Sequence, residues 1–458
     1  HFPYPRPHRT TLYKEPRGGA SRPERRKDRS GTGTRRIYAP NARRYNRAND
    51  KQTETDGMIR EFHQIDLSGR NSFGVGQQAA RLAEFETEED LRTIFSGGVP
   101  ERWAVLSGGN NILFTRDYDG LLLTPVARQI TPLGEEGDTV RVRADAGVEW
   151  DDLVEWAVER GLWGIENLSL IPGKAGAAPV QNIGAYGCEA KDVIERVHMF
   201  CTDNRSAMVI DAGHCCFGYR ESIFKHELRG RVIITAVDIR LSRTPRPRLG
   251  YGDVEREVEA RGGVTLRNIR EAICAIRRAK LPDPKVTGNA GSFFKNPVVD
   301  ECVARQLQAQ WPDMPVYPAA GCAGKVKLAA GWLIDKTGLK GYKRGRVGVH
   351  ERQALVLVNL GGATGGEVID FAHTVQMRVH EKFGIEIDTE VNIFYGTFRG
   401  FPQIHRRQRS GDARRPHSAD RFGRRGLDGH AVALHAQRLP DRRGALQFPA
   451  AGRGERRG

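Results

Sequence analysis

The central part of the chain, residues 58–396, alternates between two hydrophobic periods, and this alternation restricts the fold more than any other feature. Residues 139–144 alternate apolar and polar side chains, which predicts a strand with one buried face. Residues 151–160 instead place Leu153, Val154 and Ala157 on one side of a helix, and Gly161 follows where a left-handed residue is favoured. The sequence therefore predicts an α+β protein.

The same reading predicts four further elements. Residues 232–241 form a strand, and the apolar run 354–358 forms a buried one. Apolar residues recur every three or four positions from Val368 to Phe383, which predicts a long amphipathic helix that ends at Gly384. Residues 385–391 return to strand alternation, with Glu390 on the face opposite Ile385 and Ile387.

The two ends of the chain carry its positive charge. Residues 1–57 have a net charge of +9 and residues 397–458 of +10, so the total of +16 leaves −3 for the middle. Both ends are rich in Arg, Gly and Pro and poor in branched aliphatics, so we expect them to be disordered. Met58 then marks the expected biological start, and 397–458 a basic tail or a shifted reading frame. Genuine basic tails that bind nucleic acid are the alternative.

Cysteines and apolar runs indicate the compartment. Seven cysteines, an odd number without a C-x-x-C pair, argue against a zinc site and a disulfide framework, so we expect no metal. No run is long enough to cross a bilayer, and no signal peptide is recognisable. We therefore expect a cytoplasmic protein without a membrane partner.

Two loops are suited to binding a ligand. Residues 106–114 place Gly108 and Gly109 before two side-chain amides, and successive glycines allow backbone N–H groups to converge on phosphate. A plain tight turn explains this loop equally well. Residues 171–187 contain four glycines and almost no charge, which allows a ligand to lie against the backbone. Close packing of helices is the alternative, but two prolines disfavour a long helix there.

These loops, in this order, resemble the FAD-binding domain of the vanillyl-alcohol oxidase/MurB superfamily. Residues 179–187 resemble in particular the family of UDP-N-acetylenolpyruvoylglucosamine reductases (MurB). Four later stretches agree with that family: 217–225, 280–285, 288–297 and 327–335. The resemblance extends from Asn71 to Glu390 and implies an FAD-binding domain at 58–245 with a smaller α/β substrate-binding domain at 246–396.

The resemblance also implies which residues hold noncovalent FAD. The first loop contains no histidine of the kind that attaches flavin covalently in some relatives. Asn110 stands where the family usually has serine, which puts one side-chain hydrogen bond in doubt. The implied cofactor residues are Gly108, Gly109, Asn110, Asn111, Pro172, Gly173, Ile183, Gly184, Ala185, Tyr186 and Arg277.

The family reaction reduces the enolpyruvyl ether of UDP-N-acetylglucosamine to the lactyl ether of UDP-N-acetylmuramate for peptidoglycan synthesis. NADPH reduces FAD, and flavin N5 then passes hydride to C3 of the enolpyruvyl group. By resemblance, Arg220 stabilises the charge that develops on C2 and the carboxylate, and Ser292 donates the proton to C2. Glu390 matches the third catalytic residue, which would orient Arg220 or share that proton. A solvated Glu390 and an ordinary loop Ser292 are the alternatives that the pattern alone leaves open.

Substrate-binding residues are likewise implied by their places in the matching stretches. Tyr251 corresponds to a tyrosine on a substrate-covering loop, which assigns the chain to the first type of the family. The full implied set is Tyr219, Tyr251, Lys280, Asn296, Tyr317 and Lys327. Solvated surface lysines are the alternative for Lys280 and Lys327. We expect a monomer. The closest competing function is that of another noncovalent FAD oxidoreductase of the superfamily.

Overall fold

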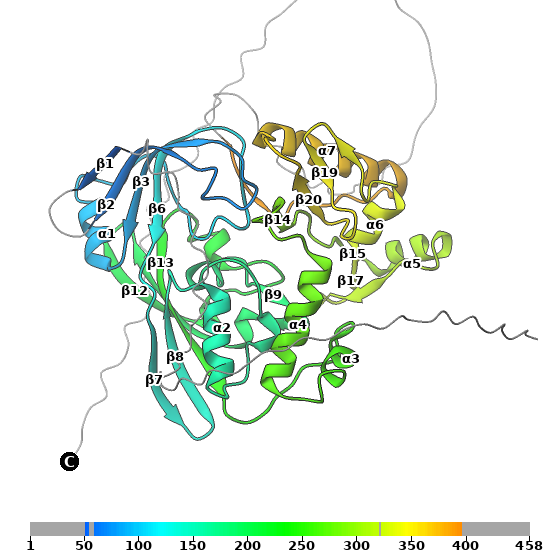
Figure 1. Cartoon of the computed structure of the whole chain (residues 1–458), viewed down its shortest axis with the longest axis horizontal. Coiled ribbons are helices and arrows are strands. Elements are labelled where there is room, and N and C mark those ends of the chain that lie inside the picture. Colours follow the sequence, from blue (N-terminus) through cyan, green and yellow to red (C-terminus); the bar gives the residue numbers. More distant parts are fainter. Residues whose placement is uncertain (1–50, 55–58, 320–321, 396–458) are drawn as a thin grey trace, which may run out of the picture. The chain divides into compact units, whose positions relative to one another are not determined.

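The computed structural model describes residues 51–54, 59–319 and 322–395 (Figure 1). The expectations for residues 1–50, 55–58 and 397–458, including the expected start at Met58, lie outside the described residues. Within the segment 1–57, which the sequence predicts to be disordered, residues 51–54 instead form strand β1 (Lys51–Glu54). This strand pairs antiparallel with β2 (Arg60–Asp66), so backbone hydrogen bonds order a segment that has no apolar pattern.

The first sheet has the strand order β1-β2-β3-β6-β4. Strand β3 (Gln78–Phe85) and strand β4 (Trp103–Val105) both run parallel to β6 (Tyr118–Pro125). Helix α1 (Glu88–Ile94) connects β3 to β4, and Thr87 begins it with a capping box that includes Asp90. The helix crosses from one parallel strand to the next, as such pairs require.

The second sheet has the order β12-β11-β13-β8-β7 and is antiparallel throughout. Its strands are β7 (Ile130–Glu136), β8 (Thr139–Asp145), β11 (Ile194–Cys201), β12 (Ser206–Asp211) and β13 (Val232–Ser242). The strands predicted at 139–144 and 232–241 are confirmed. Helix α2 (Trp150–Glu159) is also confirmed, with Gly161 at φ +70° and the predicted apolar face in the same hydrophobic cluster as β8.

The C-terminal part contains two smaller sheets. One has the order β14-β20-β19-β18 and the other β15-β17-β16. Their strands are β14 (Gly288–Ser292), β15 (Val298–Asp300), β16 (Val316–Pro318), β17 (Lys325–Leu328), β18 (Lys343–Arg344), β19 (Val347–Val349) and β20 (Val356–Asn359). Strand β20 begins two residues later than predicted, because 354 and 355 form the turn that precedes it.

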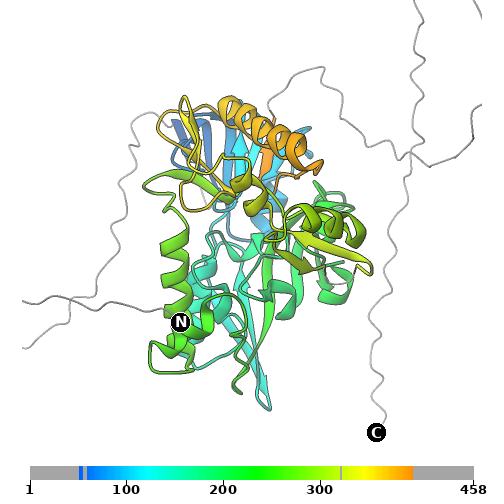
Figure 2. The ribbon, with the colours of Figure 1, turned by 90° about the vertical axis from the view of Figure 1, so that its right-hand side faces the viewer.

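Helices cover these sheets (Figure 2). Helix α7 (Gly365–Phe383) contacts β19 and β20, and Gly384 ends it at φ +66° as predicted. Helix α6 (Ala330–Lys336) packs on α7, and α5 (Glu301–Gln310) packs on β15 and β17. No described helix is both long and apolar enough to span a membrane.

Helix α4 (Leu266–Lys280) joins the two predicted domains. It follows α3 (Val254–Glu259) and contacts α2, beside which it lies in Figure 1. Its apolar face clusters with Trp163, and Arg270 forms an ion pair of 2.6 Å with Asp151. A segment that the sequence assigns to the substrate-binding domain therefore packs on the FAD-binding part.

The N-terminal and C-terminal segments of the described chain also pack against each other. One hydrophobic cluster combines residues of β2, β3 and β6 with residues of the C-terminal sheet and α7. Strand β21 (Asn392–Phe394) pairs parallel with β5 (Ile112–Phe114). The strand predicted at 385–391 is wrong: these residues pair with residues 293–295 through the isolated bridge Phe294–Thr389, and not through a continuous ladder.

Short elements complete the described structure. Strands β9 (Gly184–Ala185) and β10 (Cys188–Glu189) form a small hairpin. The 3-10 turns are η1 (Glu166–Leu168), η2 (Ala175–Ala177), η3 (Ala190–Asp192), η4 (Ala212–His214) and η5 (Ile223–Lys225). All seven cysteines are described and none is in a disulfide.

Candidate active site

The two loops predicted to bind a ligand both line one cleft of about 780 Å³. Strand β21 forms part of the same cleft, so the end of the described chain contributes to it. Seven of the predicted cofactor residues line it: Gly108, Gly109, Asn110, Asn111, Pro172, Gly173 and Ile183.

The glycines of the first loop leave no room for a side chain. A Cβ atom on Gly109, which has φ +66°, would overlap the carbonyl oxygen of Arg70. A Cβ atom on Gly108 would overlap Oδ1 of Asn110 and lie 3.1 Å from Cα of Gly173, so the two loops meet here. The two glycines are therefore needed for close packing of the first loop against its neighbours, and this packing sets the position of the backbone that lines the cleft.

One polar atom in this cleft lacks a partner. The Oγ atom of Ser107 is buried and makes no hydrogen bond to another described residue. Buried hydroxyl groups are normally hydrogen-bonded, so an unpaired one in a glycine-lined cleft fits a bound polar ligand. The donors and the small residues present thus fit a dinucleotide such as FAD.

Four predicted cofactor residues do not line this cleft. Gly184 and Ala185 lie in β9, and the ring of Tyr186 contacts that of Tyr251 at 5.8 Å. Arg277 lies in α4, where its Nε donates to the carbonyl oxygen of Leu170 at 3.2 Å. Burial lowers the pKa of Arg277. Of these four, Tyr186 and Arg277 are thus connected to Tyr251 and α4, while the carbonyl oxygen of Gly184 accepts a hydrogen bond from Arg220.

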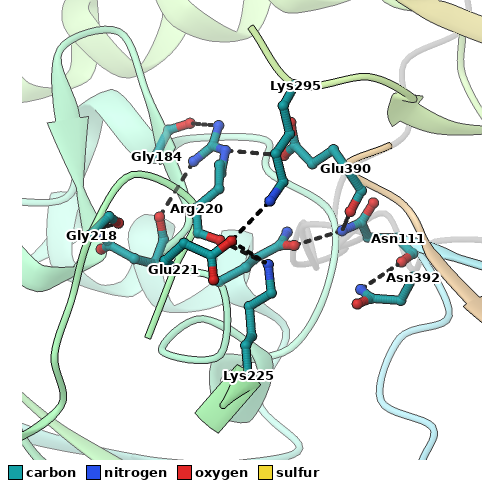
Figure 3. A network of polar contacts seen from close by, with 11 residues as sticks. Asn111, Gly184, Gly218, Arg220, Glu221, Lys225, Lys295, Glu390 and Asn392 are labelled. Carbon is teal, nitrogen blue, oxygen red and sulfur yellow. Dashed lines mark hydrogen bonds and ion pairs between the residues drawn. The ribbon is translucent and has the colours of Figure 1, made fainter. Parts of the chain in front are cut away.

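Arg220 occupies a strained turn beside the second loop (Figure 3). The backbone groups of Gly218 and Glu221 pair with each other, and Arg220 has φ +58° between them. A positive φ in a non-glycine residue costs about 1–3 kcal/mol and is found mainly where function requires it. The Nη1 and Nη2 atoms donate to the carbonyl oxygens of Asn182 and Gly184 at 3.3 and 2.7 Å.

Glu390 lies against this guanidinium. Its Oε1 is 3.0 Å from Nε of Arg220, and its side chain is 13% exposed, so the solvated alternative is excluded. No described residue accepts a hydrogen bond from Nε of Arg220. The contact with Glu390 is therefore an ion pair rather than an aligned hydrogen bond. Burial raises the pKa of Glu390, and the positive charges of Arg220, Lys295 and Lys225 only partly oppose it.

Ser292 is the last residue of strand β14. The residue that follows it, Phe293, accepts a hydrogen bond of 2.8 Å from the backbone N–H of Glu390. The Ser292 side chain is half-buried. Arg220, Glu390 and the Ser292 segment are thus joined by one ion pair and one backbone hydrogen bond.

Three charged residues that sequence reasoning missed surround this pair: Glu221, Lys225 and Lys295. Oε1 of Glu221 is 2.9 Å from Nζ of Lys295 and 3.3 Å from Nζ of Lys225. Lys225 also donates to the carbonyl oxygen of Arg220 at 2.9 Å. All three lie in the stretches 217–225 and 288–297, yet nothing in their spacing shows that they meet.

A second group of predicted residues lies on the other side of Arg220. The ring of Tyr219 lies beneath Nζ of Lys327, which is 4.6 Å from the ring centre. Tyr317 pairs with Lys327 across strands β16 and β17, and its side chain is exposed. Asn296 Oδ1 accepts from the backbone N–H of Ala330 at 3.0 Å. Tyr219 and Tyr317 therefore both adjoin Lys327, and the backbone of Asn296 hydrogen-bonds to the Tyr219 side chain.

Tyr251 and Lys280 form a separate group. Tyr251 is exposed, apart from its contact with Tyr186, and precedes α3. Lys280 ends α4 and lies 3.6 Å from Oδ2 of Asp253.

Comparison with known proteins identifies the family. The FAD binding domain profile matches residues 79–205, and that of the UDP-N-acetylenolpyruvoylglucosamine reductase C-terminal domain matches residues 283–394. The reductase of that name from Chromobacterium violaceum is 49% identical over 331 residues, which are 71% of this chain and 96% of the relative. The one from Pseudomonas aeruginosa is 47% identical over 334 residues, 72% of this chain and 97% of the relative.

A solved structure shares the fold. The MurB reductase from Thermus caldophilus superposes with a TM-score of 0.52 at 23% identity, covering 74% of this chain and 99% of that one. Because identity is nearly one half across almost the whole length of the curated relatives, this chain belongs to the UDP-N-acetylenolpyruvoylglucosamine reductase family.

Proposed function

We propose that this protein reduces UDP-N-acetylglucosamine enolpyruvate to UDP-N-acetylmuramate, with FAD as cofactor and NADPH as reductant, and that Arg220, Glu390 and Ser292 perform the chemistry. The observation that carries the assignment of roles is the buried Arg220–Glu390 pair next to the Ser292 segment. The bound flavin supplies the hydride chemistry that no side chain can provide. We propose that residues 58–245 mainly bind the cofactor and 246–396 the substrate.

Arg220 stabilises the negative charge that develops on the substrate carboxylate. Its two carbonyl contacts use one N–H of each terminal nitrogen, so one N–H on each remains for a carboxylate oxygen. The same contacts fix the plane of the guanidinium before substrate arrives, and such preorganised donors contribute more than flexible ones.

Ser292 delivers the proton to C2. Its hydroxyl has no hydrogen-bonding partner within residues 59–319 and 322–395, and it is half-buried at the end of a strand. A serine hydroxyl is a weak acid, but an enolate-type carbanion is a strong base, and nearby positive charge would stabilise the alkoxide. Lys295, three positions further on, supplies such a charge.

Glu390 holds Arg220 or shares the proton that reaches C2. Ionised, it balances the guanidinium across 3.0 Å. Because burial raises its pKa, it can also take up a proton at a higher pH than an ordinary glutamate. The geometry supports both roles, and the pH dependence described below separates them.

The surface of Tyr219, Asn296, Tyr317 and Lys327 would hold the uridine diphosphate end, with Lys327 offsetting pyrophosphate charge. Tyr251 and Lys280 would approach from α3 and α4. We also propose that the protein is a cytoplasmic monomer that binds neither nucleic acid nor membrane. The seven unpaired cysteines support a reducing compartment.

The visible spectrum of the purified chain, followed anaerobically, tests the function. We expect a flavin band that NADPH bleaches and that returns when the enolpyruvyl sugar nucleotide is added. If flavin is bound but the sugar nucleotide does not restore the band, another oxidoreductase activity of the superfamily replaces this proposal. A chain that binds no flavin would contradict both.

A further inference from the structure

The carboxylate of Glu221 lies where two segments of the active site meet (Figure 3). One segment is the turn 218–221, which carries Arg220, and the other is 292–295, which begins with Ser292. Oε1 of Glu221 contacts Nζ of Lys295 at 2.9 Å, and this is an ion pair between the two segments. Oε2 of the same carboxylate contacts Nε2 of His226 at 2.8 Å.

Lys225 contacts both Glu221 and the backbone of the Arg220 turn. Its Nζ is 3.3 Å from Oε1 of Glu221 and donates to the carbonyl oxygen of Arg220 at 2.9 Å. That carbonyl belongs to the residue with φ +58°, so the ammonium group holds the backbone of a strained turn. Without Glu221, two ammonium groups close together would repel each other and separate.

The third segment is held by the backbone. The N–H of Lys295 donates to the carbonyl oxygen of Asp388, and the N–H of Glu390 to that of Phe293, each at 2.8 Å. A shift of Lys295 therefore moves the segment that carries Glu390 as well. The Glu221–Lys295 ion pair is therefore a second connection, beside the Arg220–Glu390 pair, between these two segments and the Arg220 turn.

We propose that Glu221 is a positioning residue: through Lys295 and Lys225 it fixes the turn of Arg220 relative to the segments of Ser292 and Glu390. This inference rests on the proposed function. It assigns Glu221 no contact with substrate, because its carboxylate is occupied by Lys225, Lys295 and His226.

The charges of Glu221 and Lys295 are expected to shift the pKa of Glu390 in opposite directions, which can be measured. The groups that face Glu390 are Arg220 and Tyr219 from the turn, Lys225 from η5 and Lys295 from the segment after β14. Removing the negative charge of Glu221 leaves both lysines uncompensated and lowers the pKa of Glu390. Removing the positive charge of Lys295 raises it.

The test uses Glu221→Gln and Lys295→Met in the full-length holoenzyme, with Glu135→Gln and Lys340→Met as matched controls. Glu135 and Lys340 form exposed ion pairs with Arg243 and Asp335. The enzyme is first reduced with NADPH, and the return of flavin absorbance on mixing with the enolpyruvyl sugar nucleotide is followed from pH 5 to 9.

We expect Glu221→Gln to slow this return about 10- to 100-fold while the rate of NADPH reduction changes less than about twofold. We expect the limb of the pH profile that reports Glu390 to move about half a unit down in Glu221→Gln and up in Lys295→Met, because the substitutions remove opposite charges. Lys295→Arg should keep the wild-type limb, and both controls should match wild type.

Limbs that move in the same direction, or NADPH reduction that slows as much as the return, would overturn the proposal. If Glu221→Gln does not retain flavin, the comparison of Lys295→Met with Lys295→Arg decides, and equal limbs in these two overturn it. Wild-type enzyme in the same series separates failure of the proposed function from failure of this inference. If the proposed function is wrong, the reduced flavin of the wild-type enzyme will not be reoxidised by the sugar nucleotide.

Discussion

Nε of Arg220 lies 3.0 Å from Oε1 of Glu390, and both side chains are largely buried. Removing one partner of such a pair leaves the other charge buried and uncompensated. Arg220→Lys keeps the charge but loses the planar arrangement that reaches Asn182, Gly184 and Glu390 together. We expect the substrate-dependent return of flavin absorbance to fall about 100-fold or more, with NADPH reduction nearly unchanged.

The matched control for that prediction is Arg231→Lys, because Arg231 forms an exposed ion pair with Asp203 on the second sheet. Stopped-flow absorbance of both half-reactions measures the effect. A loss that is equal in the two half-reactions would contradict the assignment of Arg220 to the enolpyruvyl group.

Ser292→Ala removes the proposed proton donor and little volume. Positioned proton transfer contributes about 100- to 10,000-fold, so the return of flavin absorbance should slow within that range. Dissociation of the sugar nucleotide, measured by titration of the oxidised enzyme, should change less than about fivefold. Ser222→Ala is unsuitable as a control since that hydroxyl is buried and bonded. The exposed Ser96→Ala serves instead, and wild-type rates in Ser292→Ala would assign the proton to another group.

The pH dependence separates the two roles of Glu390. Burial raises its pKa, and the neighbouring Arg220, Lys295 and Lys225 oppose this only in part. The pKa of an ordinary glutamate is about 4.3, and that of Glu390 lies above it. If the ionised form holds Arg220, the rate at which flavin absorbance returns falls as the pH drops through this raised pKa. If the protonated form acts, the rate falls as pH rises through the same value. Glu390→Gln should remove the limb, and an unchanged limb would exclude both roles.

Gly109→Ala tests whether close packing of the loop 106–114 is needed for flavin binding. The added Cβ would overlap the carbonyl oxygen of Arg70 at a residue with φ +66°. Gly137→Ala is a close control, because it has φ +59° with open space around the Cβ, so it adds backbone strain alone. We expect Gly109→Ala to weaken flavin binding at least about tenfold and Gly137→Ala to leave it unchanged, as measured by flavin fluorescence. Equal flavin affinities would show that the close approach has no function.

Asp238 lies outside the candidate active site, and its carboxylate is expected to make the stability of the fold depend on pH. Its side chain is fully buried and contacts Arg143 at 2.7 Å and His198 at 2.9 Å. Burial alone would raise its pKa, but the hydrogen bonds from His198 and Arg143 outweigh burial, and the pKa lies well below its usual range. The carboxylate therefore stabilises the fold above about pH 4, and this contribution is lost as the pH falls further.

We expect Asp238→Asn to lower the free energy of unfolding by about 3 kcal/mol at pH 7 and by progressively less as the pH falls below about 4. Asp203→Asn, which breaks an exposed pair with Arg231, should cost less than about 1 kcal/mol. Thermal unfolding as a function of pH measures both. A loss for Asp238→Asn that does not depend on pH would show that charge is not the cause.

The sequence by itself determined the elements whose pattern is local. The strand of Val140 and Val142, helix α2 with Gly161, and helix α7 with Gly384 follow from hydrophobic period and glycine caps, which act within a few residues. The two ligand loops were also recognisable because their glycines and lack of charge are local properties. Resemblance then supplied the residues and the chemistry.

Only the tertiary structure decided what depends on distant pairing. Alternation at 385–391 predicted a strand and left Glu390 free to face solvent, but these residues form only an isolated bridge with residues 293–295, and Glu390 lies against Arg220. Lys51–Glu54 becomes a strand through the backbone of β2, without an apolar signal. Glu221, Lys225 and Lys295 looked like ordinary charges, because a charge near the active site is distinguished by its neighbours in space, and these come from segments that the sequence keeps apart.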